Sequence, residues 1–416
     1  MTAGSRKQAL RIAIAGGGMV GISLALALRR ALPDSDIQLI EAFPLAAGAP
    51  TTRYTPSFDA RSTALSYGSA LLYSDHGVWS TIAEHAQAIA SIHVSERGHF
   101  GSTLMQASDY QWPALGYVVE NAWLGRALLA ALGDARIDTL SPASVTSATA
   151  GSPVQLRLDN GDRLETDLLV VADGARSGLR EALGIESREQ RYGEHAVIAN
   201  IAHRKPHHGR AFERFTAEGP LAMLPLIPES SGSYRSALVW TRPPAEAAQM
   251  LEASEADFLA ALQRAFGYRL GRLQQVGERH SYPLALVEAQ EQVRSGIVVM
   301  GNAAHALHPV AGQGFNLALR DVSCLADTLA AAAAAGEDPS SLGVLQRYRE
   351  RQAGDQARTT AFSDRLPGLF MQRSLALGVL RDAGLAALDI APPLKEAFVR
   401  HTAGLAASAD YRHARP

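Results

Sequence analysis

The 416-residue sequence has a single cysteine, Cys324, and almost no excess of charge of either sign. One cysteine excludes a disulfide framework and favours a reducing compartment. Lys and Arg number 39 and Asp and Glu 41, for a net charge of −2. The chain therefore lacks the excess of positive charge that is typical of proteins that bind nucleic acid. We therefore expect a cytoplasmic globular protein that does not bind nucleic acid.

Long hydrophobic runs are also scarce. The apolar run 10–28 follows Arg6 and Lys7 and resembles a signal peptide or a membrane anchor. However, it contains four ordered glycines and leads directly into a second predicted strand, so we interpret it as part of a globular domain. No other stretch approaches the roughly 18 unbroken apolar residues that a span requires. We expect no membrane span and leave peripheral contact with the inner face of a membrane open.

Glycines follow a predicted buried strand near the start of the chain. The strand covers 12–15, and the spacing G-x-G-x-x-G follows it at Gly16, Gly18 and Gly21. This spacing permits a tight turn, close approach of a pyrophosphate, and close packing of the next helix. A helix over 22–28 and a strand over 37–41 complete a βαβ unit. The strand ends at Glu41, whose carboxylate is suited to a ribose, so the unit predicts a bound dinucleotide.

Two later segments bear on the same ligand. Segment 59–66 is expected to open a helix, and Arg61 within it is either a solvated cation or a contact to an anionic cofactor. After it we expect strands over 89–96 and 116–120 and a helix over 121–132 that ends at Gly133. A hairpin over 154–171 turns at Asn160-Gly161 and returns to the central parallel sheet. Its last strand ends at Asp173, at the edge where open α/β sheets bind ligands.

The middle of the chain has a different pattern. Between residues 191 and 283, Pro, Gly and Ser separate short strands, which predicts a mainly antiparallel second domain. The predicted elements are strands at 196–202, 210–216, 221–226 and 236–241 and a helix near 254–266. His203, His207 and His208 have no neighbouring carboxylate or thiol, so we expect a solvated turn there and no metal site.

The last third returns to cofactor-type motifs. A predicted strand over 295–300 precedes a loop whose Gly312 and Gly314 offer free amides where a helix opens, at 315–335. Residues 342–405 are expected to be helical, with breaks at Pro367 and Pro392-Pro393. A leucine-rich surface between 366 and 388 has two interpretations: a cap or oligomer interface, or a face that rests on a membrane or partner.

Three motifs in this order resemble those of the class A flavoprotein aromatic hydroxylases, a family of FAD monooxygenases. They are GGGMVG with Glu41, VADGARS, and GNAAHALHPVAGQGFN. The stretches HVSERGHFG, RAFERFTAEGPLAMLPL and GQGFNLALRDV further resemble the ubiquinone-biosynthesis branch. This resemblance implies an α/β fold of the para-hydroxybenzoate hydroxylase type, with a Rossmann-like FAD-binding domain, a smaller antiparallel-sheet substrate domain and a C-terminal helical region. The implied bounds are 1–80, 101–190 and 284–350 for the first, 81–100 and 191–283 for the second, and 351–416 for the third.

The resemblance also assigns cofactor contacts. Gly16, Gly18 and Gly21 would hold the FAD pyrophosphate and Glu41 the adenosine ribose. Further FAD contacts would come from Arg61, Asn121 and Arg126, and Asp173 with Gly174 belongs to a motif linked to both FAD and NAD(P)H. Pro309, Gly312, Gln313 and Gly314 would flank the isoalloxazine ring.

One position departs from the family. Asn302 stands where the family usually has Asp. The amide oxygen can still accept a hydrogen bond from a ribityl hydroxyl, but without charge assistance. FAD binding is therefore expected to be retained and weakened.

The resemblance implies hydroxylation of a prenylated phenol with NAD(P)H and O2, through a flavin C4a-hydroperoxide. His305 and His308, beside Pro309, are candidates for the base that activates the phenol. Other ubiquinone-biosynthesis proteins are implied as partners. Two alternatives stay open: a hydroxylase of a small soluble phenol, and a non-catalytic FAD-binding scaffold whose chemistry is lost through Asn302.

Overall fold

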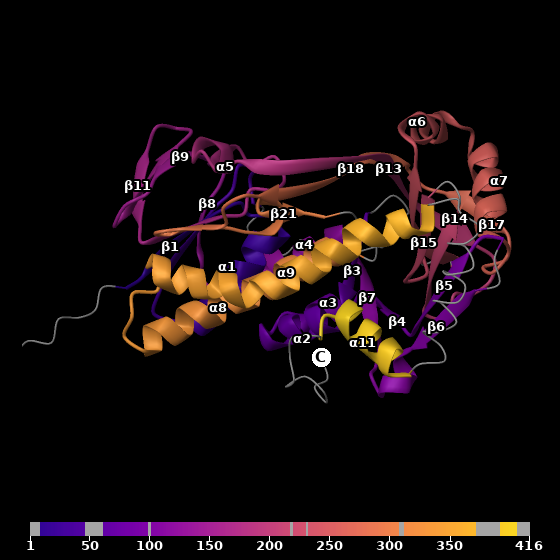
Figure 1. Cartoon of the computed structure of the whole chain (residues 1–416), viewed down its shortest axis with the longest axis horizontal. Coiled ribbons are helices and arrows are strands. Elements are labelled where there is room, and N and C mark those ends of the chain that lie inside the picture. Colours follow the sequence, from indigo (N-terminus) through magenta and orange to yellow (C-terminus); the bar gives the residue numbers. More distant parts are fainter. Residues whose placement is uncertain are drawn as a thin grey trace, which may run out of the picture.

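The computed structural model describes residues 9–45, 61–98, 101–216, 219–229, 232–307, 312–371 and 392–405. Two large sheets organise these residues, and the 17-residue strand β13 (Ser187–His203) runs from one toward the other (Figure 1). The first sheet carries the cofactor-type motifs, and the second carries most of the chain between residues 187 and 289.

The first sheet has six strands in the order β19-β20-β12-β1-β2-β8, all parallel except β19. Their bounds are β1 Arg11–Ala15, β2 Asp36–Ile40, β8 Asp138–Leu140, β12 Leu168–Val171, β19 Val293–Arg294 and β20 Ile297–Val299. Strand β12 is buried along its whole length, because parallel strands are covered on both faces. The carboxyl ends of β1, β2, β12 and β20 meet at one edge of this sheet.

Helices cover one face of the first sheet, and a small β-sheet covers the other. Residues Ile12 and Ile14 of β1 pack on the helical side, while Ala13 and Ala15 pack on the opposite side. The helices are α1 Met19–Ala31, α4 Asn121–Asp134, α8 Gln313–Ala334 and α9 Leu342–Met371, and α9 lies against α8. The opposite layer comprises β9 Val145–Thr149, β10 Val154–Leu158, β11 Arg163–Thr166 and α5 Gly178–Ala182.

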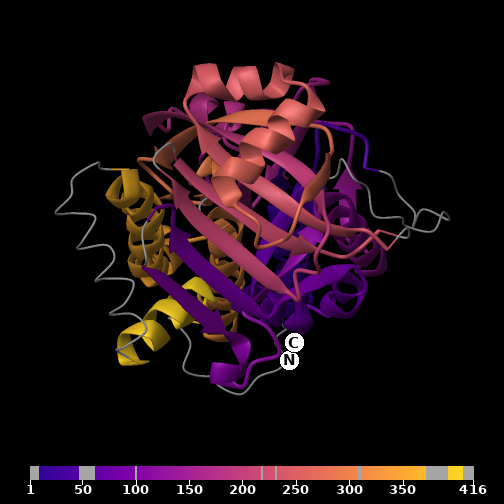
Figure 2. The same ribbon diagram turned by 90° about the vertical axis from the view of Figure 1, so that its right-hand side faces the viewer.

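The second sheet is mainly antiparallel and has the order β21-β18-β13-β16-β15-β14-β5-β6, with β17 paired to β13. Its outer face packs on α7, which lies across it in Figure 2 together with α6. Besides β13, the bounds are β5 Ser91–Glu96, β6 Ser102–Gln106, β14 Arg210–Thr216, β15 Gly219–Leu226, β16 Tyr234–Arg242, β17 Leu273–Val276, β18 His280–Ala289 and β21 His305–Ala306, with α6 Pro244–Glu252 and α7 Glu255–Phe266. Its inner face looks back toward the first sheet.

A small third sheet, β3-β7-β4, lies between the two and is flanked by short helices. Its strands are β3 Ser62–Ser66, β4 Ala86–Ile89 and β7 Gly116–Glu120. The remaining elements are α2 Tyr67–Asp75, α3 Trp79–Ala83, the 3-10 turns η1 Ala107–Tyr110 and η2 Gly301–Ala303, and α11 Pro392–Thr402. Helix α11 docks on α2 through a hydrogen bond from the Gly68 amide to the Ala403 carbonyl oxygen (2.8 Å).

Most predicted elements are confirmed, including the first βαβ unit, the hairpin, and α7 and α8. Four predictions are wrong. Segment 62–66 is the strand β3, because it pairs with β7, and the helix starts only at Tyr67. The predicted strand over 89–96 is two strands in different sheets. Helix α4 continues through Gly133, and α9 continues through Pro367. The predicted domain bounds stay a prediction.

The histidines of the second sheet are also not in a solvated turn. His203 ends β13 and contacts the Lys205 carbonyl oxygen and the Ser236 hydroxyl through its two ring nitrogens, at 2.8 and 3.0 Å. His207 is likewise buried and contacts the Leu226 carbonyl oxygen (2.9 Å). Burial lowers the pKa of His203 to about 4, so its ring packs as a neutral group. Of the three, His208 is exposed.

Candidate functional site

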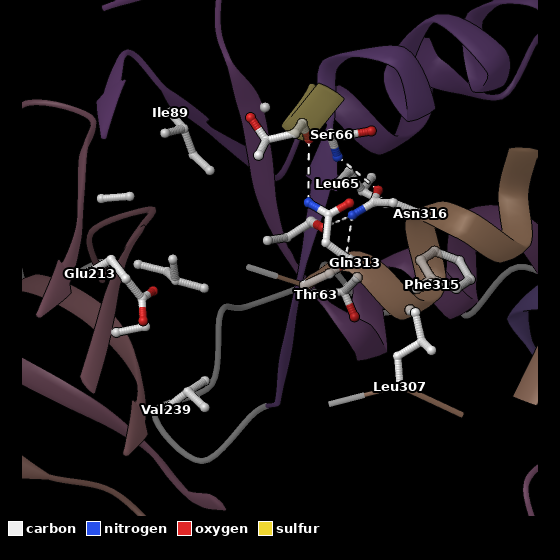
Figure 3. A pocket seen from close by; sticks show the side chains of 18 of the residues that line it. Thr63, Leu65, Ser66, Ile89, Glu213, Val239, Leu307, Gln313, Phe315 and Asn316 are labelled. Carbon is white, nitrogen blue, oxygen red and sulfur yellow. Dashed lines mark hydrogen bonds between the residues drawn. The ribbon is translucent and has the colours of Figure 1, made fainter. Parts of the chain in front are cut away.

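A cavity of 820 Å³ lies between the carboxyl ends of the central strands and the inner face of the second sheet. One end is built from the glycine turn after β1, the residues after β12 and β20, and the start of α8. The other end is a largely apolar wall from strands β5, β6, β13, β14, β15 and β16, closed by side chains of α9 and α11. Figure 3 shows residues of both ends pointing into this space.

The predicted glycine turn has the expected shape. Gly16 has φ +115°, and a Cβ there would collide with the Ala172 carbonyl, so another residue would be strained and obstructed. A Cβ on Gly21 would overlap the Gly16 carbonyl oxygen, because helix and strand approach closely. The Gly17 amide donates to a carboxylate oxygen of Glu41 at 2.5 Å. These contacts fix the turn against the end of β2.

Gly18 differs from its neighbours. It lines the cavity, its φ is an ordinary −71°, and no atom lies within 4 Å of where its Cβ would be. It is also the N-cap of α1, and no side chain caps that helix. The first amides of a helix lack intrahelical partners and favour an anion. Open space in front of uncapped amides fits the pyrophosphate of a dinucleotide such as FAD.

Arg61, Asn121 and Arg126 are not among the described residues that line the cavity. Arg61 is exposed and donates to the Tyr282 hydroxyl oxygen (3.1 Å), and the Asn121 amide donates to the Arg61 carbonyl oxygen (2.8 Å). The Asn121 side chain accepts from Thr63, which does line the cavity, at 2.6 Å. Arg126 stacks over the Trp123 ring, 5.8 Å from its centroid. Their roles as FAD contacts stay predictions.

The ends of β12 and β20 bring Gly174 and Asn302 to the cavity. Asp173 is exposed beside them and accepts a long hydrogen bond from the Leu179 amide (3.4 Å). Turn η2, which carries Asn302, is held from below by Arg180. This buried guanidinium donates to the Ala303 carbonyl oxygen at 3.0 Å. Sequence reasoning missed Arg180, although it follows the VADGARS motif closely.

The start of α8 forms the floor of the cavity. Gly312 has φ +61° and is the N-cap, and Gln313 and Gly314 line the cavity after it. Asn316 fixes this turn: its side-chain oxygen accepts from the Ser66 amide (2.8 Å), and its nitrogen donates to the Ala64 and Gly312 carbonyl oxygens (2.9 and 2.7 Å). Sequence reasoning missed Asn316, because its partners Ser66 and Ala64 are about 250 residues away in the chain.

His305 points away from the cavity. It alternates on β21 with Ala306, which is a lining residue, and it is buried with Nε2 2.9 Å from a carboxylate oxygen of Asp321 on α8. His305 is thus not among the described residues that line the cavity, and its role as a base stays a prediction. The other two predicted catalytic residues, His308 and Pro309, lie outside the described residues.

Glu213 is a further site residue that sequence reasoning missed. It points into the cavity from β14, between Ala211 and Phe215 on the same face (Figure 3). Among the described lining residues it is the one ionisable side chain. Burial away from bulk water raises its pKa to about 7. The signal was present in the sequence, since strand alternation in Ala211–Phe215 places a charge in an apolar row.

Comparisons with known proteins show which family the chain belongs to. Residues 9–362 match the family described as FAD binding domain. The chain is 34% identical over 403 residues to the ubiquinone hydroxylase UbiL of Rhodospirillum rubrum, covering 96% of this chain and 91% of that protein. It is 31% identical over 404 residues to the 3-demethoxyubiquinol 3-hydroxylase of Escherichia coli, covering 96% and 99%.

A solved structure shows the same fold. The p-nitrophenol 4-monooxygenase PnpA of Pseudomonas putida superposes with a TM-score of 0.74 at 18% identity, covering 96% of this chain and 98% of that one. At this identity the likeness speaks to the fold alone. It confirms the predicted fold class, an α/β cofactor domain with an antiparallel sheet beside it.

Proposed function

The chain belongs to the FAD binding domain family, and on that premise we propose that it is an FAD-dependent monooxygenase of ubiquinone biosynthesis. Its substrate would be a polyprenylated phenol, hydroxylated on the aromatic ring with NAD(P)H and O2 as co-substrates. The amino-acid sequences of these motifs most resemble those of 2-polyprenyl-6-methoxyphenol hydroxylase. The proposed substrate class is therefore a prenylated methoxyphenol.

The observation that carries the proposal is the two-ended cavity. Backbone amides at the glycine turn and at the start of α8 suit the phosphates and the electron-rich ring edge of FAD. The opposite end presents apolar side chains over several strands, including Ile92, Met105 and Leu224. Moving a tail of several isoprene units from water to such a wall gains about 0.8 kcal/mol for each CH2. The wall therefore favours a long apolar substrate over a small polar phenol.

Bound FAD supplies the redox chemistry, accepting electrons from NAD(P)H and activating O2 for transfer of one oxygen atom to the ring. The chain's own residues do the rest. Gly18 would leave room for the pyrophosphate, Glu41 would hold the ribose, and Gly312 with Gly314 would keep the backbone open toward the flavin ring. The apolar wall excludes water from the reacting atoms.

We further propose that the substrate comes from a lipid phase by peripheral contact of the protein. None of the described helices is long and apolar enough to cross a membrane. Part of the leucine-rich surface predicted to make the contact, residues 372–388, lies outside the described residues. Helix α11, which follows that segment in the sequence, supports the proposal, because its Phe398 and Val399 line the cavity.

The test is turnover against tail length. FAD-loaded protein would be given phenols with zero, one, two and four isoprene units, and NADPH oxidation and hydroxylated product would both be measured. We expect kcat/KM to rise steeply with tail length, since each unit adds apolar contact. A flat profile would favour the small-phenol hydroxylase, and FAD binding without phenol-stimulated NADPH oxidation would favour the scaffold.

A further inference from the structure

Strand pairing places Glu213 in the middle of an apolar row that crosses the inner face of the second sheet. Register pairs Glu213 with Val94 on β5 and with Ala222 on β15, and Ala222 pairs in turn with Val239 on β16. All four side chains line the cavity. A carboxyl in such a row weakens the apolar wall unless it has a task there, because burying a charge without a partner is costly.

The neighbours of Glu213 do not supply a counter-charge. Within the described residues its carboxyl makes no hydrogen bond and no ion pair. Along β14 the same face carries Ala211 and Phe215, and helix α9, which packs against β14, presents Phe362 to the cavity. None of these side chains titrates. The carboxyl thus retains its full capacity to accept a hydrogen bond from whatever enters the cavity.

Figure 3 shows where that partner would stand. Glu213 projects from the sheet wall across the cavity from Thr63, Gln313 and Phe315, which belong to the cofactor end. An aromatic ring held between the two ends would have a hydroxyl directed at the sheet wall and a ring carbon directed at the cofactor end. This placement matches a phenol, which has its polar group on an otherwise apolar ring.

We propose that the Glu213 carboxylate is the base that takes the proton of the substrate's phenolic hydroxyl. The inference rests on the proposed function. In this step the phenol O–H bond breaks, an O–H bond forms on the carboxylate, and the electron pair stays on the phenolic oxygen. Its charge then spreads into the ring and enriches the carbons ortho and para to the oxygen, where the incoming oxygen atom attaches. The proton leaves later to solvent.

Burial tunes Glu213 toward this task. An ordinary Glu lies about six pKa units below a phenol of Tyr type, so it is a weak base toward it. With the pKa of Glu213 raised to about 7, the gap falls to about three. A base whose pKa lies near the working pH combines a sizeable ionised fraction with sufficient proton affinity. Since the base acts when ionised, turnover should rise as pH increases through 7.

The experiment uses the FAD-loaded protein and 2-geranylphenol, with its methyl ether as a ligand that has no proton to give. Four variants would be compared: Glu213→Gln, Glu213→Asp, His308→Asn and Glu189→Gln. Glu189 is a matched carboxylate on β13 of the same sheet, exposed and paired with Arg191. The readouts are FAD content, hydroxylated product, the pH profile of kcat/KM, and binding of phenol against ether by flavin fluorescence.

We expect Glu213→Gln to keep its FAD, to lose product formation by about 100-fold or more, and to lose the rise near pH 7. It should also lose most of the preference for the phenol over the ether. Glu213→Asp should regain part of the rate together with the pH dependence, and Glu189→Gln should behave as the parent.

Three results would overturn the inference. A Glu213→Gln protein with the parent's rate and profile would do so, as would loss of the pH 7 rise in His308→Asn alone. A parent profile without a rise near pH 7 would also do so, whether or not any variant folds. If the parent neither binds nor oxygenates the phenol, the proposed function itself fails, and the inference falls with it.

Discussion

We expect Gly18 to be required for FAD binding but not for folding, and the substitution Gly18→Val tests this expectation. A Cβ at this position meets no atom within 4 Å, and the φ of −71° suits any residue. Protein atoms therefore do not oppose the substitution. The added isopropyl group enters the cavity in front of the first amides of α1, which is the space proposed for the pyrophosphate.

The magnitudes follow from this geometry. Without cofactor, the variant should lose no more than about 1 kcal/mol of unfolding free energy, since valine is a poorer N-cap than glycine. With cofactor, it should lose the stabilisation that FAD gives the parent, about 2.7 kcal/mol at a free FAD concentration one hundred times Kd. The two proteins should thus unfold at similar temperatures when stripped and at different temperatures when FAD is added.

The assay is thermal unfolding of stripped protein with and without FAD, together with the flavin absorbance of the protein as purified. Gly21→Ala is the contrasting control, because a Cβ there overlaps the Gly16 carbonyl oxygen and should destabilise the stripped protein itself. A folded, yellow Gly18→Val protein with the parent's FAD affinity would refute the reasoning. Destabilisation of the stripped variant as large as that of Gly21→Ala would refute it as well.

Three further predictions concern polar side chains at the site. Asn302→Asp should tighten FAD binding by about 1 kcal/mol and Asn302→Leu should weaken it, measured by FAD titration; equal affinities would mean that the side chain does not touch the cofactor. Asn316→Ala should destabilise the protein by about 2–4 kcal/mol in denaturant unfolding, since it leaves the buried Ser66 amide and two carbonyls without their partner. Raising the pKa of Glu213 to about 7 costs stability where the unfolded chain is ionised, so the stripped Glu213→Gln protein should gain up to about 3 kcal/mol at pH 8 and almost nothing at pH 4. A gain that does not depend on pH would show that the pKa of Glu213 is not raised in the folded protein.

Local sequence predicted those parts of the fold whose causes are local. The turn at Gly16 and the helix after it depend on backbone freedom and on residues a few positions apart. Strand β3 was mistaken for a helix because its short polar segment becomes a strand only by pairing with β7, more than fifty residues later. Glu120 and Arg235 form a buried ion pair at 2.9 Å. The sequence around either residue does not indicate that the other is its partner.

The sequence also located the glycine motifs of the site, but it did not show which way individual side chains point. The residues that carry glycine motifs, such as Gly18, Gly174 and Gly312, do line one cavity. His305 stays a predicted base, although its ring lies beside Asp321 and it is not among the described residues that line the cavity. Strand alternation in the sequence already places Glu213 in an apolar row, but only the register and the cavity lining show that this side chain faces the cavity.

The docking of α11 on α2 has a consequence for biosynthesis. The cavity begins with residues of the first βαβ unit, but its last wall is contributed by Thr402 and Ala403, and the Gly68 amide that anchors Ala403 is made more than three hundred residues earlier. A ribosome adds residues in order, so the growing chain can shape the glycine turn long before it can enclose a flavin. The site closes only when almost the whole chain has emerged. Incomplete translation products would therefore hold the glycine turn without the enclosed cavity, and stable loading with FAD would distinguish finished chains from unfinished ones.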